Sequence, residues 1–173
     1  MNILEKFKAI KTFIFDMDGV ITDGSLLILN DTEWLRKVDI KDGYGMHEAA
    51  NHNYLMVVIS GSTSEPTKKR LYHLGVKDVF MKVNNKKELL QKYMSENNLE
   101  PSEVLYMGDD IPDYDCMGVV GLSCCPADAV SELKQIVQYI SPFNGGHGCV
   151  RDVIEKVLKL NDHWPLHSHT PAL

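Results

Sequence analysis

The sequence lacks long apolar runs and clusters of basic residues. No stretch approaches the roughly 20 apolar residues that a membrane-spanning helix needs, so we expect no membrane partner. The formal net charge is −6 and no basic run stands out, which argues against a nucleic-acid-binding surface. The stretch 1–11 is too short and too charged for a signal peptide. These absences favour a cytoplasmic globular protein.

Cysteine is also scarce, with four residues among 173. Cys116, Cys124, Cys125 and Cys149 match no zinc-binding spacing, because no C-x-x-C pair is matched by a second one. Neighbours such as Cys124 and Cys125 rarely form a disulfide with each other. We therefore expect reduced thiols in the core of a cytosolic protein.

Short apolar runs alternate with stretches of helical periodicity. Strands are expected from Ile10 to the acids at 16–18 and at 55–60, 76–81, 104–107, 119–123 and 137–140. Helices are expected at 45–53, 65–74, 86–97, 111–117, 128–134 and 150–160. This alternation predicts one α/β domain over 1–160, a three-layer, Rossmann-type parallel sheet with helices on both faces. Ligands bind beyond the carboxyl ends of the strands in such sheets.

Two segments depart from the alternation. The stretch 25–40 contains two extended runs joined near Asn30-Asp31, which predicts a β-hairpin arm after the first strand. Its apolar side chains would be exposed on a small domain, so we expect the arm to contact another subunit. Residues 161–173 show no periodicity and are expected to fray. We interpret the histidines at 163, 167 and 169 as part of this tail and not as a metal site.

Carboxylates and a hydroxyl follow the first two predicted strands. Asp16 and Asp18 lie two residues apart on extended chain, so their side chains point the same way. One can attack phosphorus while the other delivers a proton to the leaving oxygen. Ser60 and Gly61 follow the second strand, where a hydroxyl and backbone N–H groups can hold phosphoryl oxygens. Each pattern alone is also compatible with an ordinary turn.

A lysine and a second group of carboxylates complete the set. Lys86 precedes the helix expected at 86–97, and Asp109, Asp110 and Asp113 follow the strand expected at 104–107. Carboxylates crowded at a strand end repel one another unless a cation is present, and oxygen ligands together with phosphate chemistry favour Mg²⁺. The crowding further predicts a raised pKa for Asp18.

The order D-x-D-G-V, then Ser, then Lys, then G-D-D-x-x-D resembles that of the haloacid dehalogenase-like superfamily, over about 10–160. The resemblance implies a Mg²⁺-dependent phosphatase that forms an aspartyl-phosphate on Asp16, with Asp18 as the general acid and base. It implies Ser60 and Lys86 as the phosphate-binding pair. It also implies metal contacts from the carboxylates of Asp16 and Asp109 and the backbone carbonyl of Asp18, with Asp110 and Asp113 in support. Asp113 is expected to hold either Lys86 or a metal-bound water. The choice among Mg²⁺, Mn²⁺ and Co²⁺ stays open.

The intervals on either side of Gly61 are too short for the cap domain that most of these enzymes carry. The layout resembles one capless subfamily, the 3-deoxy-D-manno-octulosonate 8-phosphate phosphatases. Four stretches carry this likeness: DMDGVITDG at 16–24, DIKDGYG at 39–45, GDDIPD at 108–113 and GGHGCVRDV at 145–153. The resemblance implies hydrolysis of that sugar-acid phosphate in lipopolysaccharide precursor synthesis. It also implies a homotetramer in which hairpin arms pack together and neighbouring subunits complete each site.

The same resemblance implies a set of contacts to the sugar acid. The expected residues are Asp39, Ile40, Lys41, Asp42, Gly43, His47, Gly61, Ser62, Arg70 and, from the tail element, Gly145, Gly146 and Arg151. Many relatives have arginine where this chain has Lys41, His47 and Ser62. Arginine grips a carboxylate with two parallel hydrogen bonds, which lysine and serine cannot do. Recognition of the sugar's carboxylate would therefore rest on Lys41, His47 and Arg70.

Several alternatives stay open. The substrate could be a nine-carbon sugar-acid 9-phosphate, or the enzyme could be a phosphomutase or a general nucleotide phosphatase. A non-catalytic binding module is a further alternative, although the intact catalytic set speaks against it. Asp42 could simply cap a helix turn at Gly43, and Arg151 could be a solvated residue. The sequence does not decide whether the segment 145–151 acts in its own subunit or in a neighbour's.

Overall fold

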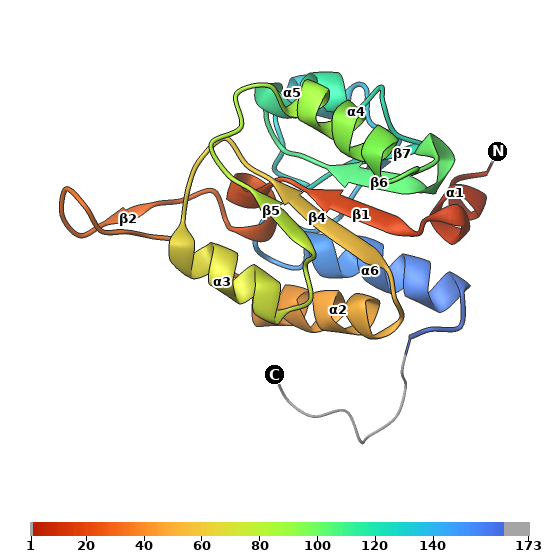
Figure 1. Ribbon diagram of the computed structural model, residues 1–173, viewed down its shortest axis with the longest axis horizontal. Coiled ribbons are helices and arrows are strands. Elements are labelled where there is room, and N and C mark those ends of the chain that lie inside the picture. The colour runs from red at the N-terminus through yellow and green to blue at the C-terminus, as the bar shows by residue number, and fades with distance from the viewer. Residues whose placement is uncertain (1, 165–173) are drawn as a thin grey trace.

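The computed structural model describes residues 2–164 of the chain. At its centre lies a six-stranded sheet in the order β5-β4-β1-β6-β7-β8, and every neighbouring pair is parallel (Figure 1). The strands are β1 (Thr12–Phe15), β4 (Leu55–Ile59), β5 (Asp78–Phe80), β6 (Val104–Met107), β7 (Leu122–Cys125) and β8 (Tyr139–Ile140). Phe15, at the end of β1, is level with Val58 of β4 and Met107 of β6. The residues that follow these three strands therefore meet at one edge of the sheet.

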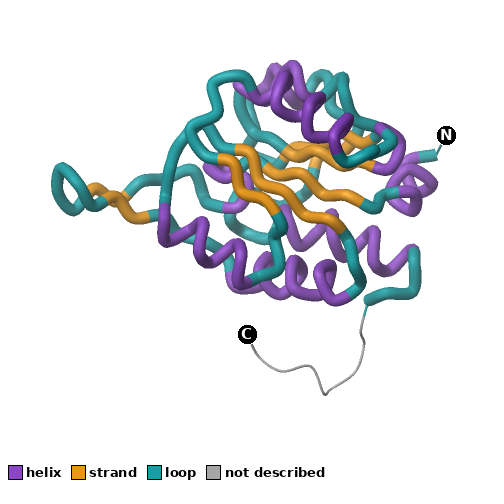
Figure 2. Tube along the Cα trace, in the orientation of Figure 1, coloured by secondary structure: helices purple, strands orange, loops and turns teal. Residues whose placement is uncertain are grey.

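Helices cover both faces of the sheet (Figures 1 and 2). One layer consists of α1 (Ile3–Ala9), α2 (Ile40–Asn51), α3 (Glu65–His73) and α6 (Cys149–Leu160), and the opposite layer of α4 (Lys86–Glu96) and α5 (Ser131–Lys134). Short helical turns lie next to the strands. They are η1 (Met17–Ile21) after β1, η2 (Pro101–Glu103) before β6 and η3 (Ile111–Cys116) after β6. This arrangement confirms the predicted three-layer α/β class.

Alternate side chains of β1 anchor the two layers. Phe13 and Phe15 belong to a core cluster that includes Ile154 of α6, while Ile14 points into a second cluster with Leu90 of α4. All five side chains are fully buried. Burying one such side chain is worth roughly 1.5–3 kcal/mol. The central strand is thus held on both faces, which keeps its carboxyl end in a defined position.

The bounds of the observed elements differ from the predicted ones in several places; α5, for example, begins at Ser131 and not at 128. α2 begins at Ile40 and not at 45, because Asp39 caps it by accepting the N–H of Lys41 at 2.6 Å. β7 begins at Leu122 and not at 119. α1 was not predicted, and it starts with a capping box formed by Asn2 and Glu5. Among residues 2–164, no helix is long and apolar enough to cross a membrane.

The predicted hairpin arm lies between β1 and α2. β2 (Leu27–Ile28) pairs with β3 (Trp34–Leu35) in antiparallel fashion, and Figure 1 shows the arm projecting away from the sheet. Asn30 holds the turn, because its Oδ1 accepts the N–H groups of Thr32 and Glu33. The large apolar residues of the arm from Leu26 to Val38 are between 37% and 62% exposed. The arm thus presents an apolar surface outside the core of its own domain.

The first residues of the predicted tail are packed and not frayed. Asn161 donates from Nδ2 to the carbonyl of Lys8 at 3.2 Å, and His163 pairs with the hydroxyl of Tyr54 at 3.0 Å. The ordered chain therefore continues past the predicted boundary at 160. His167 and His169 lie outside the described residues.

Candidate active site

The expected catalytic residues converge at the carboxyl edge of the sheet. They line one cavity of about 300 Å³, formed by the ends of β1, β4 and β6 and the start of α4. Its lining comprises Asp16, Asp18, Gly24, Ser60, Gly61, Ser62, Lys86, Asp109, Asp110, Pro112 and Asp113. Motifs that are far apart in sequence therefore share one site, as the parallel topology predicts.

Lys86 joins two of the carboxylates. Its Nζ lies 2.9 Å from Oδ1 of Asp16 and 2.8 Å from Oδ1 of Asp113. All three side chains are buried. Burial and the charge of Asp113 raise the pKa of Asp16, while Lys86 opposes this change. Burial alone would lower the pKa of Lys86, but Asp16 and Asp113 raise it, so this lysine keeps its positive charge.

Asp113 is held by groups other than Lys86 as well. Its Oδ1 also accepts the hydroxyl proton of Tyr106 at 2.6 Å, and its Oδ2 accepts the N–H of Asp109 at 3.2 Å. Both oxygens of this fully buried carboxylate are therefore occupied. The geometry agrees with the expectation that Asp113 holds Lys86. Sequence reasoning did not find Tyr106, whose contribution depends on how β6 faces η3.

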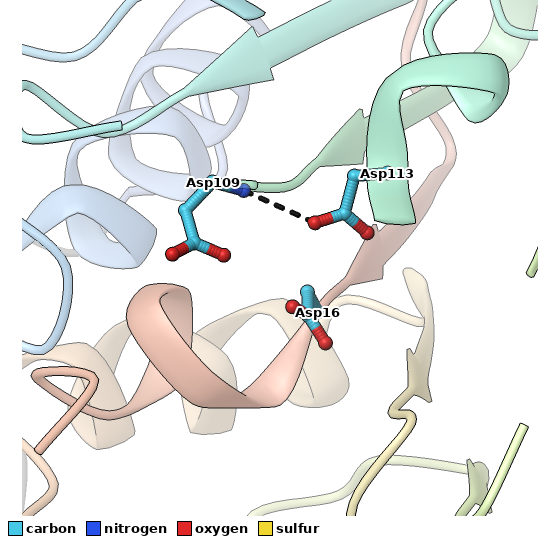
Figure 3. Close-up of side chains that lie close together, drawn as sticks. All are labelled: Asp16, Asp109 and Asp113. Carbon is cyan, nitrogen blue, oxygen red and sulfur yellow. Dashed lines mark hydrogen bonds between the residues drawn. The ribbon is translucent and has the colours of Figure 1, made fainter. Parts of the chain in front are cut away.

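Asp109 has the environment of a cation ligand. Asp16, Asp109 and Asp113 each offer one carboxylate oxygen, and these three atoms lie within 4.8 Å of one another (Figure 3). Oδ1 of Asp109 is buried and has no hydrogen-bond partner among the described residues. Burial, together with Asp113 and Asp110, raises the pKa of Asp109 to about 7. Since Asp113 is already occupied, Asp16 and Asp109 are the carboxylates that fit Mg²⁺, a cation that prefers oxygen ligands.

Asp18 is oriented by a group that the sequence did not point to. Arg36, at the base of the arm, donates from Nε to Oδ1 of Asp18 at 2.7 Å and from Nη2 to Oδ2 at 3.2 Å. The hydroxyls of Ser62 and Thr22 also donate to this carboxylate. Burial would raise the pKa of Asp18, but the hydrogen bonds from Arg36 and Ser62 outweigh it and hold the pKa below its usual range. The predicted rise in the pKa of Asp18 is therefore wrong.

The carboxylate of Asp18 is turned toward Arg36 and is not part of the cluster formed by Asp16, Asp109 and Asp113. The expected contact from Asp18 to the metal, through its backbone carbonyl, stays a prediction. Close approach in this region depends on glycine, since a Cβ on Gly19 would lie 1.9 Å from Oδ2 of Asp109. Gly19 also has a positive φ of 85°, which favours glycine.

Of the residues expected to contact the sugar acid, Gly61 and Ser62 line this cavity, and the others are not among its lining residues. Asp39, Lys41 and Arg151 line a separate hollow of about 430 Å³ between the start of α2 and α6. Ile40 is largely exposed, and His47 lies within hydrogen-bond distance of Asn51. A Cβ on Gly43 would lie 3.4 Å from Nη2 of Arg70, which places these two expected residues side by side. Their contact with substrate stays a prediction.

Asp42 has a structural role in this chain. It is buried, and its carboxylate accepts the N–H of Arg151 at 2.6 Å and that of Gly148 at 3.2 Å. One N–H group thus reaches each carboxylate oxygen at the start of α6, and the contact of Asp42 with substrate stays a prediction. The alternative of a cap was correct in kind, but the helix that Asp42 caps is α6 and not its own.

Arg151 is held by neighbouring side chains. Its Nε donates to Glu155 at 2.7 Å, and its guanidinium lies over the rings of Trp164 and Tyr44, 4.2 Å and 5.0 Å from their centroids. These contacts fix Trp164, the last described residue, against α2 and α6. The alternative that Arg151 is a freely solvated side chain is wrong.

The glycine pair at 145–146 packs on the catalytic loop of its own chain. Gly146 donates its N–H to the carbonyl of Val20 at 2.9 Å. A Cβ on Gly145 would lie 1.9 Å from the carbonyl oxygen of Gly19, and one on Gly146 would lie 2.4 Å from the nitrogen of Asp23. Only glycine fits at these positions, and the segment supports η1 within the same subunit.

The fold and the aspartate-lined edge are those of the haloacid dehalogenase-like class, and the family model described as haloacid dehalogenase-like hydrolase matches residues 71–154. Among curated proteins, the 3-deoxy-D-manno-octulosonate 8-phosphate phosphatase of Salmonella typhi is 31% identical over 157 residues, covering 91% of this chain and 84% of that protein. The chain therefore belongs to the family of 3-deoxy-D-manno-octulosonate 8-phosphate phosphatases.

Two solved structures extend this similarity to three dimensions. The 3-deoxy-D-manno-octulosonate 8-phosphate phosphatase of Yersinia pestis is 29% identical, with a TM-score of 0.89 over 92% of this chain and 86% of that chain. The enzyme of the same name from Moraxella catarrhalis is 26% identical, with a TM-score of 0.89 over 93% of each chain. That second structure is a complex with a magnesium ion, a phosphate ion and a KDO molecule.

Proposed function

We propose that this chain is a Mg²⁺-dependent phosphatase that hydrolyses 3-deoxy-D-manno-octulosonate 8-phosphate, in the synthesis of lipopolysaccharide precursors. The observation that carries the proposal is the convergence of Asp16, Lys86 and Asp109 in one cavity of a chain from this family. A phosphate ester can approach only where positive charge offsets the carboxylates. Lys86 supplies one such charge, and Mg²⁺ held by Asp16 and Asp109 would neutralise the charge of the phosphoryl oxygens.

The side chains support a two-step reaction. A carboxylate oxygen of Asp16 attacks phosphorus, the P–O bond to the sugar breaks, and Asp18 gives its proton to the departing sugar oxygen. Water then attacks the phosphorus of the aspartyl-phosphate, Asp18 accepts the proton of that water, and phosphate and Asp16 are released. Ser60 and Lys86 hold the phosphoryl oxygens in both steps. The ion pair with Arg36 favours the ionised form of Asp18, which accepts the proton in the second step, whereas the first step draws on the protonated form that this pair disfavours.

We propose that the arm makes the enzyme a homotetramer and that neighbouring subunits complete each site. The exposed apolar side chains of the arm support this idea, because a surface of that kind on a small domain favours assembly. In the part of the chain that the structure describes, no separate domain covers the cavity. A cytoplasmic location stays a prediction.

The test is kcat/KM for phosphate release with Mg²⁺, measured on eight- and nine-carbon sugar-acid phosphates, hexose phosphates and mononucleotides. We expect a preference of about a hundredfold or more for the eight-carbon 8-phosphate, which corresponds to roughly 2.7 kcal/mol of transition-state binding. A preference for the nine-carbon 9-phosphate would assign the chain to that substrate instead. A flat profile, or one biased toward nucleotides, would refute the proposed substrate and leave phosphatase chemistry in place.

A further inference from the structure

Arg36 is the residue of the arm that turns inward. Its side chain is only 5% exposed, whereas the neighbouring apolar residues Trp34, Leu35 and Val38 are each exposed over more than a third of their whole surface. A long charged side chain is rarely buried without paired charges. The burial of Arg36 therefore indicates a specific contact and not a general preference of the arm for the protein surface.

The guanidinium of Arg36 links two elements of the active site. Its Nε and Nη2 face the two oxygens of Asp18, at 2.7 Å and 3.2 Å, and Nη2 also donates to Oγ of Ser62 at 3.2 Å. Ser62 in turn donates to Oδ2 of Asp18 and lies 3.1 Å from Oγ of Ser60. One side chain from the arm thus ties η1 to the loop that follows β4.

This geometry restricts the rotation of Asp18. The side chain of Asp18 is 33% exposed, so packing alone leaves it room to turn. A two-pronged pair between guanidinium and carboxylate fixes both oxygens and is stronger than a neutral hydrogen bond. Lysine carries the same charge but cannot match both oxygens at once. Proton transfer requires the carboxylate within hydrogen-bond reach of the reacting oxygen, so its orientation affects the rate directly.

We propose that Arg36 is a positioning residue, which orients Asp18 for proton transfer and holds Ser62 beside it. The proposal rests on the proposed function, because it takes Asp18 as the acid and base. It also gives the arm a direct route to the active site within one subunit. Whatever stabilises the arm, including a second copy packed on its exposed apolar side chains, stabilises the orientation of Asp18.

The experiment is a double-mutant cycle on kcat between Arg36→Met and Asp18→Asn, with Arg36→Lys as the conservative variant. Lys37→Met is the matched control, because it removes an exposed cation from the adjacent position of the same arm. The assay uses whichever primary sugar phosphate the wild type hydrolyses fastest. The cycle is therefore informative even if the eight-carbon substrate proves wrong. Thermal unfolding of each variant reports on its folding.

We expect Arg36→Met to lower kcat about 10- to 100-fold, as for other residues that orient a reacting group, and to change KM less than about threefold. Arg36→Lys should recover part of this loss, and Lys37→Met should match the wild type. In the Asp18→Asn background, Arg36→Met should cost little more, because residues that act as a unit are not additive. An unchanged kcat, or a loss that persists in full beside Asp18→Asn, would overturn the proposal. If Arg36→Met fails to fold, the same cycle with Arg36→Lys decides.

Discussion

Asp42 is the group whose titration should leave a clear mark on the stability of the fold. Burial, opposed by the N–H groups of Arg151 and Gly148, raises the pKa of this carboxyl to about 6 from an ordinary value of 3.8. The native state therefore binds a proton more readily than the unfolded chain between about pH 4 and pH 6. Within that window, the free energy of unfolding must fall as the pH rises.

The size of the effect follows from the two pKa values. They differ by about 2, and one pKa unit corresponds to roughly 1.4 kcal/mol. The contribution of Asp42 to the free energy of unfolding should thus decrease by about 3 kcal/mol between pH 4 and pH 6 and stay level at higher pH. Solvent screening should reduce this free-energy change only slightly, because Asp42 is only 2% exposed.

The measurement is urea unfolding of the wild type and of Asp42→Asn from pH 4 to pH 7, at one protomer concentration. Other carboxylates also titrate, so the informative quantity is the difference between the two proteins at each pH. This difference should shift by about 3 kcal/mol in favour of the asparagine variant as the pH rises. Asp39→Asn, a change in the cap of α2, should keep most of the wild-type pH dependence. A pH-independent difference for Asp42→Asn, or a shift of opposite sign, would refute the reasoning.

Three further predictions concern catalysis and assembly. Asp16→Asn should lower kcat by at least about 10³-fold, because it removes the nucleophile, with an unchanged thermal unfolding temperature; a fully active variant would contradict the mechanism. Asp113→Asn should lower kcat about 10- to 100-fold by releasing Lys86, and a lowered pKa of Lys86, followed by NMR, would support that cause. Shortening the turn around Asn30 should weaken assembly and activity together, as sedimentation and phosphate release would show, and an active monomer would contradict the shared site.

Most of the fold could be predicted because each central strand is a short apolar run that ends in polar residues. The start of α2 could not be predicted from propensity, since its first turns contain Gly43 and Gly45, which disfavour helix. Tertiary packing overrides that preference. A Cβ on Gly45 would lie 3.0 Å from Cδ of Arg151, so glycine allows α2 to approach α6 closely. The start of β7 was missed because the apolar run extends on both sides of Gly121.

The convergence of the expected catalytic residues could be predicted because each of them lies directly at a strand end or a helix start. Arg36 and Tyr106 could not be predicted, because their contacts depend on how the arm folds back and how β6 faces η3. The substrate contact that the likeness to the family implies for Asp42 stays a prediction, whereas its structural role depends on a long-range contact that the sequence did not indicate. The carboxylate was already engaged by the backbone of α6, 106 residues away in sequence. Local motifs predict which groups reach the sheet edge, and long-range contacts decide which of them are free to react.

The charges of the cavity show which groups remain free. Five carboxylates line it, and Lys86 is the one cation among its described lining residues. Lys86 forms ion pairs with Asp16 and Asp113. Arg36, which is not one of the lining residues, forms an ion pair with Asp18. Asp109 is left with a buried oxygen that has no partner among the described residues. An unpaired buried carboxylate is costly, and natural sequences keep such costs mainly at functional sites. Asp110 is exposed and needs no such partner. The protein thus pairs the carboxylates that need a fixed orientation and leaves Asp109, with its buried oxygen, to be neutralised by a divalent cation.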